Sequence, residues 1–427
     1  MRKWIGAFLI FLFVGALLVA CGPDEKEPAG EASSNDGDTN EMPEKPDELK
    51  LWVNAEEKQE EAVKDIAEQY TEETGIEVKL TPVDMLDQIE KLDVEGPAGN
   101  GPDIIFQPHD RIGDLVIRGL VDPVHLGDLE SEYTDTAIDA VTYDDDEWGY
   151  PAVLETYAMY YNKGKVDEVP ETMEDVMDIA ESDTDADNDE FGFLMEADNF
   201  YYTYPFFAGY GAYVFDNEDG NYDIDDIGLD NDGAIEGGEL VQSWYDEGYI
   251  PSDITEDIMN GLFKEGKVST IITGPWMARE FADGLGDDLG ATPIPELENG
   301  EHPNSFVGVK SYMLSTYSEN KEWAEDLMGY ITNKENGLTY YDVAGEMPAR
   351  EDALDDELIA DDEIFSAFAE QTEYGEPMPS VPAVQQIWDP INDALTFISE
   401  GEPVDEVLSE AVKTIEDNIE ASGATEQ

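Results

Sequence analysis

The sequence is short of cysteine, of basic residues and of long apolar stretches. Its 427 residues include one cysteine, Cys21, so no intramolecular disulfide can form. Lys and Arg number 21 against 104 Asp and Glu, which gives a formal net charge of −83. That balance excludes binding to nucleic acid or to an anionic membrane surface by charge. After the first twenty residues, no stretch is long and apolar enough to predict a transmembrane helix.

The one long apolar stretch predicts a lipoprotein signal peptide at residues 1–20. A basic pair precedes an apolar core, and Leu-Val-Ala-Cys at 18–21 forms a lipobox. Cleavage before Cys21 would leave its thiol at the new N-terminus for lipid attachment. An ordinary signal peptide followed by a chance cysteine stays open as the alternative. We therefore expect a protein on the extracellular face of the cell membrane, in contact with the membrane only through this lipid anchor.

The acidic composition raises disorder as a first alternative. Residues 21–48, rich in Pro, Gly, Ser and acids, fit it and predict a flexible linker after the acylated cysteine. Beyond them, 10% aromatic and 41% hydrophobic content indicate a packed interior with acids outside. The remaining chain, about 375 residues, exceeds the size of one hydrophobic core, so two lobes are expected. Since salt screens self-repulsion, we infer a salt-rich habitat.

The folded part opens with a predicted β-α-β unit. Apolar residues alternate with polar ones at 49–53 and again at 76–80, which is typical of half-buried strands. Between them, residues 56–70 repeat apolar positions at helical spacing, and Gly75 is placed to end that helix. The apolar run at 104–106 predicts a third, buried strand. Because helices separate the strands, we expect a parallel sheet with ligands beyond the carboxyl ends of its strands.

An acid and a base, Asp110 and Arg111, follow the third strand at that edge. They are the first candidates for function, and an ion pair that pins a loop is the structural alternative. Glu155 is a second candidate, because it interrupts a run of apolar and aromatic residues at 148–162. A carboxylate in that setting is either a ligand contact between lobes or a structural acceptor for backbone amides.

Large aromatic residues recur near predicted element ends. Tyr201 lies in the densest aromatic segment, 199–207, and Trp276 lies where a strand gives way to a helix. Trp388 precedes a final helical region. Such rings supply either core volume or flat platforms for sugar faces. From the residues alone, core is the first interpretation.

Alternating acids at 183–190 raise the question of a metal site. Asp185, Asp187, Asp189 and Glu196 fall at positions one, three, five and twelve of a calcium-loop pattern. Glu190 occupies the position where the sharp turn of such a loop wants glycine. A solvated acidic turn is therefore the favoured interpretation, and calcium is the alternative.

Several short stretches, in their order and spacing, resemble one family. They are Leu51-Trp-Val-Asn54, Thr74-Gly-Ile76, Gly101-Pro-Asp-Ile-Ile-Phe106, His109-Asp-Arg111, Tyr161-Asn-Lys163, Tyr222-Asp-Ile224, Thr273-Gly-Pro-Trp276, Phe306-Val-Gly-Val309 and Met378-Pro379. Over residues 49–420 the chain is similar to maltose- and maltodextrin-binding proteins, the extracellular solute-binding subunits of ATP-binding-cassette (ABC) sugar importers.

The resemblance implies an α/β, two-lobe periplasmic-binding-protein-like fold. Each lobe would be a mainly parallel sheet flanked by helices, and a three-segment hinge would join the lobes. Lobe one would comprise residues 49–153 and 306–357. Lobe two would comprise residues 158–302 and 361–420, followed by a C-terminal tail at 421–427.

The resemblance also assigns roles to charged residues. Asp110 and Arg111 would hydrogen-bond sugar hydroxyls from lobe one, and Glu155 would reach the same sugar from beside the hinge. An acid-lysine pair of the family appears here as Glu57 and Lys58, with one extra residue before the helix.

The same resemblance favours ligand contact over core packing for the large aromatic residues. Tyr201, Trp276 and Trp388 would stack against glucosyl faces from lobe two. This sequence departs from the best-known member at two places. Gln107 occupies the position where that member has a tryptophan. The segment Asn199-Phe-Tyr-Tyr replaces its Glu-Pro-Tyr-Phe.

The implied function is extracellular binding of maltose and maltooligosaccharides, with cyclodextrins as further candidates. Ligand-induced lobe closure would deliver the sugar to the permease of an ABC importer. The protein would be a monomer without a cofactor or enzymatic activity. A different oligosaccharide, a surface adhesin, and a secreted glycosidase using Asp110 and Glu155 are the alternatives. Arg111 beside Asp110 favours a charged acceptor over a general acid.

Overall fold

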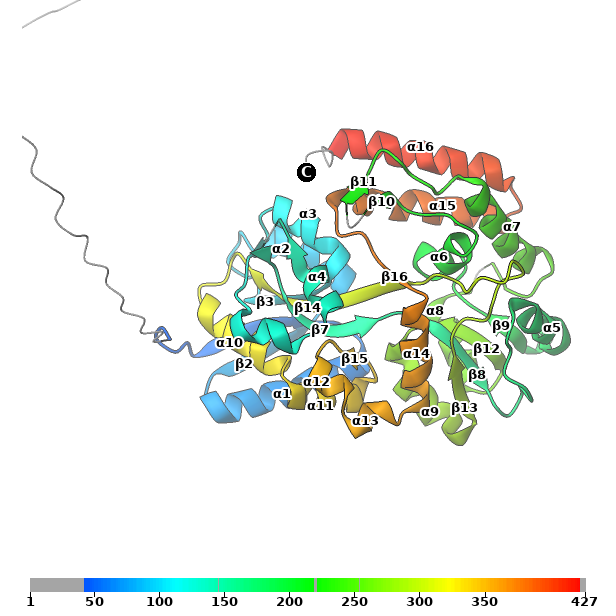
Figure 1. Ribbon diagram of the computed structural model, residues 1–427. Helices are drawn as coiled ribbons and strands as arrows, with labels where there is room; N and C mark the ends of the chain where they lie inside the picture. Colours follow the sequence, from blue (N-terminus) through cyan, green and yellow to red (C-terminus); the bar gives the residue numbers. More distant parts are fainter. Residues whose placement is uncertain (1–41, 145, 219–220, 253, 423–427) are drawn as a thin grey trace, which may run out of the picture. The chain divides into compact units, whose positions relative to one another are not determined.

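The computed structural model describes residues 42–144, 146–218, 221–252 and 254–422 (Figure 1). The predicted signal peptide, the lipid-attachment residue Cys21, most of the predicted linker and residues 423–427 of the tail lie outside the described residues. Among the described helices, none combines the length and the apolar composition that crossing a bilayer requires.

The predicted β-α-β unit opens the fold. Strand β1 (Glu48–Val53) pairs in parallel with β2 (Glu77–Pro82) on one side and β3 (Ile104–Pro108) on the other. Helix α1 (Glu57–Thr74) connects β1 to β2 and ends at Gly75, whose φ of 73° is left-handed. Glycine adopts that conformation without a Cβ clash, so the predicted helix end is confirmed.

The rest of the first sheet is largely antiparallel. Strand β14 (Phe306–Ser315) lies between β3 and β7 (Tyr150–Glu155) and runs antiparallel to both. Strand β15 (Met347–Pro348) pairs antiparallel with β7, while β4 (Val121–Asp122) pairs antiparallel and β16 (Glu376–Pro377) parallel with β14. The expectation of a mainly parallel sheet is wrong here, because β14 enters from the second sheet, against the direction of β3.

The second sheet has the order β13-β8-β12-β9. Its strands are β8 (Ala158–Asn162), β9 (Phe191–Leu194), β12 (Val268–Thr273) and β13 (Leu289–Thr292). Only the β9–β12 pair is parallel, so this sheet is also mixed. Two small antiparallel pairs lie apart, β5 (Thr142–Tyr143) with β6 (Asp146–Glu147) and β10 (Asp216–Glu218) with β11 (Asn221–Asp223).

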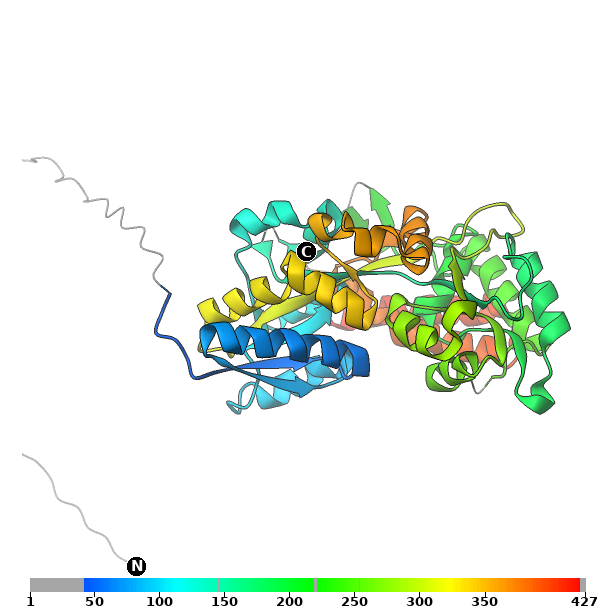
Figure 2. The same cartoon turned by 90° about the horizontal axis from the view of Figure 1, so that it is seen from below.

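Helices pack around both sheets (Figures 1 and 2). With the first sheet belong α2 (Gln88–Glu95), α3 (Ile112–Ile117), α4 (Asp135–Val141), α10 (Lys321–Ile331), α11 (Lys334–Ala344) and α12 (Glu351–Leu354). The helices that pack with the second sheet are α5 (Met173–Asp183), α8 (Glu256–Lys264), α9 (Ala278–Leu285) and α14 (Glu363–Glu373). Helix α13 (Glu357–Ala360) connects α12 to α14. A further group packs together, comprising α6 (Phe200–Ala208), α7 (Asp232–Asp246), α15 (Trp388–Ser399) and α16 (Val404–Ser422).

Short 3₁₀ turns complete the described part. They are η1 (Met85–Asp87), η2 (His109–Arg111), η3 (Gly127–Glu132), η4 (Ala186–Asn188), η5 (Pro275–Met277), η6 (Gly286–Asp288) and η7 (Pro382–Gln386). Two of them, η2 and η5, each follow a buried strand directly and carry predicted site residues.

Two hydrophobic cores, one on each sheet, account for the fold. The chain passes from the first sheet to the second between β7 and β8 and returns between β13 and β14. Strand β14 takes part in both cores: Phe306 packs in the second, while Val309 and Tyr312 pack in the first. The fold is therefore the predicted two-lobe α/β type, and the lobe boundaries given above stay a prediction.

Candidate functional site

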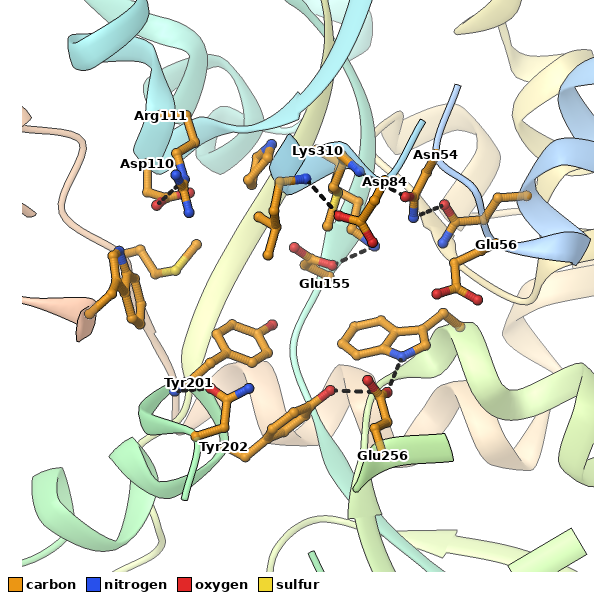
Figure 3. Close-up of a pocket in the computed structure, with 18 of the residues that line it drawn as sticks. Asn54, Glu56, Asp84, Asp110, Arg111, Glu155, Tyr201, Tyr202, Glu256 and Lys310 are labelled. Carbon is orange, nitrogen blue, oxygen red and sulfur yellow. Dashed lines mark hydrogen bonds and ion pairs between the residues drawn. The ribbon is translucent and has the colours of Figure 1, made fainter. Parts of the chain in front are cut away.

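A cavity of about 410 Å³ is lined by side chains from strands of the first sheet and from turns and helices next to both sheets (Figure 3). Its volume falls in the range of small-molecule sites. Six predicted site residues line it: Asp110, Arg111, Glu155, Tyr201, Trp276 and Trp388. Glu57 and Lys58 do not; Lys58 instead pairs with Glu61 at 3.1 Å, and this part of the chain presents Glu56 and Gln59 to the cavity.

Asp110 and Arg111 lie on η2, directly after β3, as predicted from the strand's end. Arg111 Nε lies 3.5 Å from Asp110 Oδ2. Gln385 Nε2 donates to two oxygens of Asp110, the backbone carbonyl at 2.8 Å and Oδ2 at 3.1 Å. The ion pair considered as the structural alternative therefore exists. Because both side chains also line the cavity, the ion pair and a ligand contact are compatible.

His109 fixes the position of this turn. Its Nδ1 accepts from the backbone N–H of Val309 at 3.1 Å, so its Nε2 carries the proton and donates to the Met378 carbonyl at 3.1 Å. Burial lowers the pKa of His109, which keeps the ring neutral and suits this arrangement. The imidazole thus connects η2 with β14 and with the segment after β16.

Glu155 ends β7 and belongs to a buried charge cluster, Glu155–Lys310–Glu346. Lys310 Nζ lies 2.7 Å from Glu155 and 2.6 Å from Glu346, and all three side chains are at most 5% exposed. Burial acts to lower the pKa of Lys310, but the two carboxylates outweigh it and leave the pKa above its ordinary value. Burial raises the pKa of Glu155, against the opposing effect of Lys310. Glu155 thus pairs with a lysine rather than with backbone amides.

Trp276, on η5 after β12, is held from two directions. Its Nε1 donates to Glu256 Oε1 at 3.3 Å, and Tyr202 Oη donates to the same oxygen at 3.3 Å. Lys310 Nζ lies over the Trp276 ring, 4.8 Å from its centroid. Since Lys310 lies on β14 of the first sheet, this cation–π contact joins elements of the two sheets.

Tyr201 and Trp388 are each part core and part cavity. Tyr201 packs edge-on to Tyr157 at 4.8 Å between ring centroids, and Trp388 lies 6.1 Å from Phe306. Both nevertheless line the cavity. The Tyr201 hydroxyl and Trp388 Nε1 are buried without a hydrogen-bond partner among the described residues. A buried polar group of this kind favours a site that a polar ligand completes.

The other rings of the aromatic segment follow the core interpretation. Helix α6 buries Phe200, Tyr204, Phe206 and Phe207 in the second core. Asn199 caps this helix by accepting from the Tyr201 backbone N–H at 3.0 Å, and it lines the cavity. Gln107 does not line it; its side chain is buried and bonds to backbone and side-chain groups near η1.

The structure does not bring the four acids of the calcium pattern together. No group of His, Cys, Asp and Glu in the described ranges is arranged to hold a metal ion. Asp185 accepts from Asn188 at 2.8 Å, and Asp189 ends a 3₁₀ turn in the left-handed conformation. Glu196 lies beyond the far end of β9, where it accepts from Asn199 at 2.9 Å. The strand between them separates the carboxylates that the pattern would bring together.

Several charged residues of the cavity were missed from the sequence: Glu56, Asp84, Glu256, Lys310 and Asp389. Lys310 is the only charged residue in the strand Phe306–Ser315, so it interrupts an apolar run in the same way as Glu155 does. Glu256 gave no such signal, because it is one acid among many in an acidic chain. Glu56 also faces the cavity; the surrounding protein raises the pKa of its carboxyl, and the charge of Glu256 raises it further.

Comparison with known proteins places the chain in a family. Residues 65–367 match the model of the bacterial extracellular solute-binding proteins. The galactooligosaccharide-binding protein of Bacillus subtilis is 35% identical over 430 residues, covering 99% of this chain and 98% of that protein. The maltodextrin-binding protein MdxE of the same organism is 32% identical over 426 residues, with 97% of each chain covered.

A solved structure agrees with these matches. A cyclo/maltodextrin-binding protein complexed with maltotetraose is 37% identical and superposes with a TM-score of 0.76, over 89% of this chain and 99% of that one. Fold, family match and near-complete coverage of relatives point the same way. The chain is a bacterial extracellular solute-binding protein.

Proposed function

We propose that this protein binds maltose and maltooligosaccharides outside the cell and delivers them to the permease of an ABC importer. One observation carries the proposal: a single cavity brings the rings of Tyr201, Trp276 and Trp388 together with the charged groups of Asp110 and Arg111. Rings cover the weakly apolar faces of a sugar, and charged groups bond its hydroxyls.

The relatives support a glucose-based ligand. One of the relatives is a maltodextrin-binding protein, and the solved cyclo/maltodextrin-binding protein holds maltotetraose. Linear maltooligosaccharides are therefore the first ligands we propose, and cyclodextrins are further candidates.

The arrangement of the cavity supports delivery by lobe closure. Asp110 follows a strand of the first sheet, whereas Trp276 follows a strand of the second. A ligand that contacts both sides binds the closed arrangement best, so it shifts the population towards that arrangement. The permease would recognise the closed form. We extend the proposal to a lipid anchor at Cys21, lobes with the boundaries given above, and a monomeric protein without a cofactor.

Titration calorimetry on the purified protein tests the proposal. We expect saturable, one-to-one binding of maltose, maltotriose or maltotetraose, with sucrose and raffinose as negative controls. An absence of heat with every maltooligosaccharide and cyclodextrin would contradict it.

A galactooligosaccharide is the second candidate ligand. The observation that favours it is the relative at 35% identity, which is named for that ligand. A β-linked galactotriose belongs in the same titration series. If galactotriose binds more tightly than maltotriose, the preferred ligand is a galactooligosaccharide rather than a maltooligosaccharide. The protein would still be an oligosaccharide-binding protein.

We further propose that the protein does not hydrolyse its ligand. The family binds solutes, and Glu155 is held in a buried ion pair with Lys310. Incubation of maltotriose with stoichiometric protein should release no glucose. Steady release of glucose would support the glycosidase alternative.

A further inference from the structure

The cavity contains a carboxylate on the side predicted to carry only stacking rings. Glu256 is the first residue of α8, and it lines the cavity together with Tyr202 and Trp276. Figure 3 shows it beside Tyr202 and across the cavity from Asp84 and Glu155. Stacking of aromatic rings on the faces of a sugar does not explain why the carboxylate of Glu256 lies between Tyr202 and Trp276 in the cavity.

Both hydrogen bonds of the Glu256 side chain fall on one of its two oxygens. Oε1 accepts from both Trp276 Nε1 and Tyr202 Oη, each at 3.3 Å. For Oε2, no hydrogen bond is formed within the part of the chain that the structure describes. A carboxylate has capacity for about four hydrogen bonds, so two acceptor positions remain on a group that faces the cavity.

Glu256 lies at the N-terminus of α8, which Thr255 caps. Thr255 accepts from the Ile258 backbone N–H at 3.4 Å, and the Glu196 carboxylate accepts from the backbone N–H of Glu256. The backbone at Glu256 is thereby held in place, and its side chain faces the cavity.

We propose that Glu256 is a specificity-determining residue of the oligosaccharide site. One oxygen orients the Trp276 and Tyr202 rings, and the other accepts a hydrogen bond from a hydroxyl of the sugar ring next to Trp276. Glu256 thereby ties the position of the stacking ring to recognition of one hydroxyl at the edge of the same sugar. This inference rests on the proposed function.

Two substitutions separate the two roles. Glu256→Gln keeps an acceptor oxygen for Trp276 and Tyr202 but replaces the free acceptor with a donor and removes the charge. Glu256→Ala removes both roles. Asp257→Asn is the matched control, because it removes the same charge from the next residue of α8, which is exposed and does not line the cavity.

The dissociation constants of maltotriose and of β-linked galactotriose are measured by calorimetry for wild type and the three variants. A charge-assisted hydrogen bond corresponds to about a tenfold to a hundredfold weaker binding when lost. We expect that loss for Glu256→Gln on whichever sugar the wild type binds, a larger loss for Glu256→Ala, and a change below about twofold for Asp257→Asn.

Tryptophan emission of the unliganded variants gives the second readout. Glu256→Ala should shift the emission of Trp276, whereas Glu256→Gln should leave it near that of wild type. Wild-type affinity in Glu256→Gln would overturn the inference while leaving the proposed function intact. If the wild type binds neither sugar, the proposed function fails and the inference fails with it.

Discussion

The two sides of the cavity differ in chemistry, although each includes residues on a 3₁₀ turn that follows a buried strand. The first-sheet side carries Asp110, Arg111 and the buried Lys310, while the second-sheet side carries Tyr201 and Trp276. Each side also has one charged residue among or against the aromatic rings of the second-sheet side. Lys310 lies against the Trp276 ring, and Glu256 puts a charge among the rings. The two sides are therefore joined by a direct contact between Lys310 and the Trp276 ring.

The sharpest test of the first-sheet side is Lys310→Met. Removing the cation leaves Glu155 and Glu346 as buried carboxylates without their partner, which we expect to cost about 3 to 5 kcal/mol in the free energy of unfolding. Urea unfolding followed by circular dichroism measures it. Lys321→Ala is the control, because Lys321 pairs with Asp122 on the surface and should change stability little. Equal, small effects of both substitutions would show that the buried cluster contributes no more than a surface pair.

The second-sheet side is tested by Trp276→Ala and Trp388→Ala. Each ring should contribute to the affinity for maltotriose, and its loss should weaken binding by about tenfold to a hundredfold. The melting temperature of the unliganded protein should change little, since both side chains are only partly buried.

Trp244→Ala is the matched control for the rings. Trp244 is fully buried in the second core and does not line the cavity. Its loss should cost about 3 to 5 kcal/mol of stability. If Trp276→Ala destabilises the unliganded protein as much as Trp244→Ala does, then Trp276 belongs to the core and the division of the cavity into two roles is wrong.

The smallest expected effect concerns Glu56, which faces the cavity from the start of α1. Its pKa is raised in the folded state, first by burial and then by Glu256, so the folded protein holds this proton more tightly than the unfolded chain. Its charge therefore disfavours the folded state above the folded pKa, and this penalty disappears as the pH falls towards 4.5. Glu56→Gln should raise the melting temperature at pH 7 by up to about 2 °C.

Thermal melts of Glu56→Gln and wild type between pH 4 and pH 8 provide the measurement. The difference between the two proteins should shrink as the pH is lowered. Glu57→Gln is the control, because Glu57 does not line the cavity. A difference that stays constant with pH would contradict the electrostatic origin.

Much of this arrangement could be predicted from residue patterns, and the failures have physical reasons. Asp110 and Arg111 were found because a strand's carboxyl end is a general ligand position, and Glu155 because a charge in an apolar run needs a partner. Glu57 and Lys58 do not line the cavity, since one extra residue before a helix rotates the following residues by about 100° around its axis. The antiparallel direction of β14 was not predicted, because the spacing of apolar residues in a sequence does not indicate in which direction a strand runs in its sheet.

Strand β14 has a consequence for how the molecule loses its structure. One end of this single strand places Phe306 in the second core, where its ring stacks on Tyr204 at 3.8 Å, and the remainder pairs with β3 and β7 in the first sheet. Melting of either lobe would pull a shared strand out of the other. Both halves should therefore denature in one cooperative transition, with equal calorimetric and van't Hoff enthalpies, although each has a core of its own.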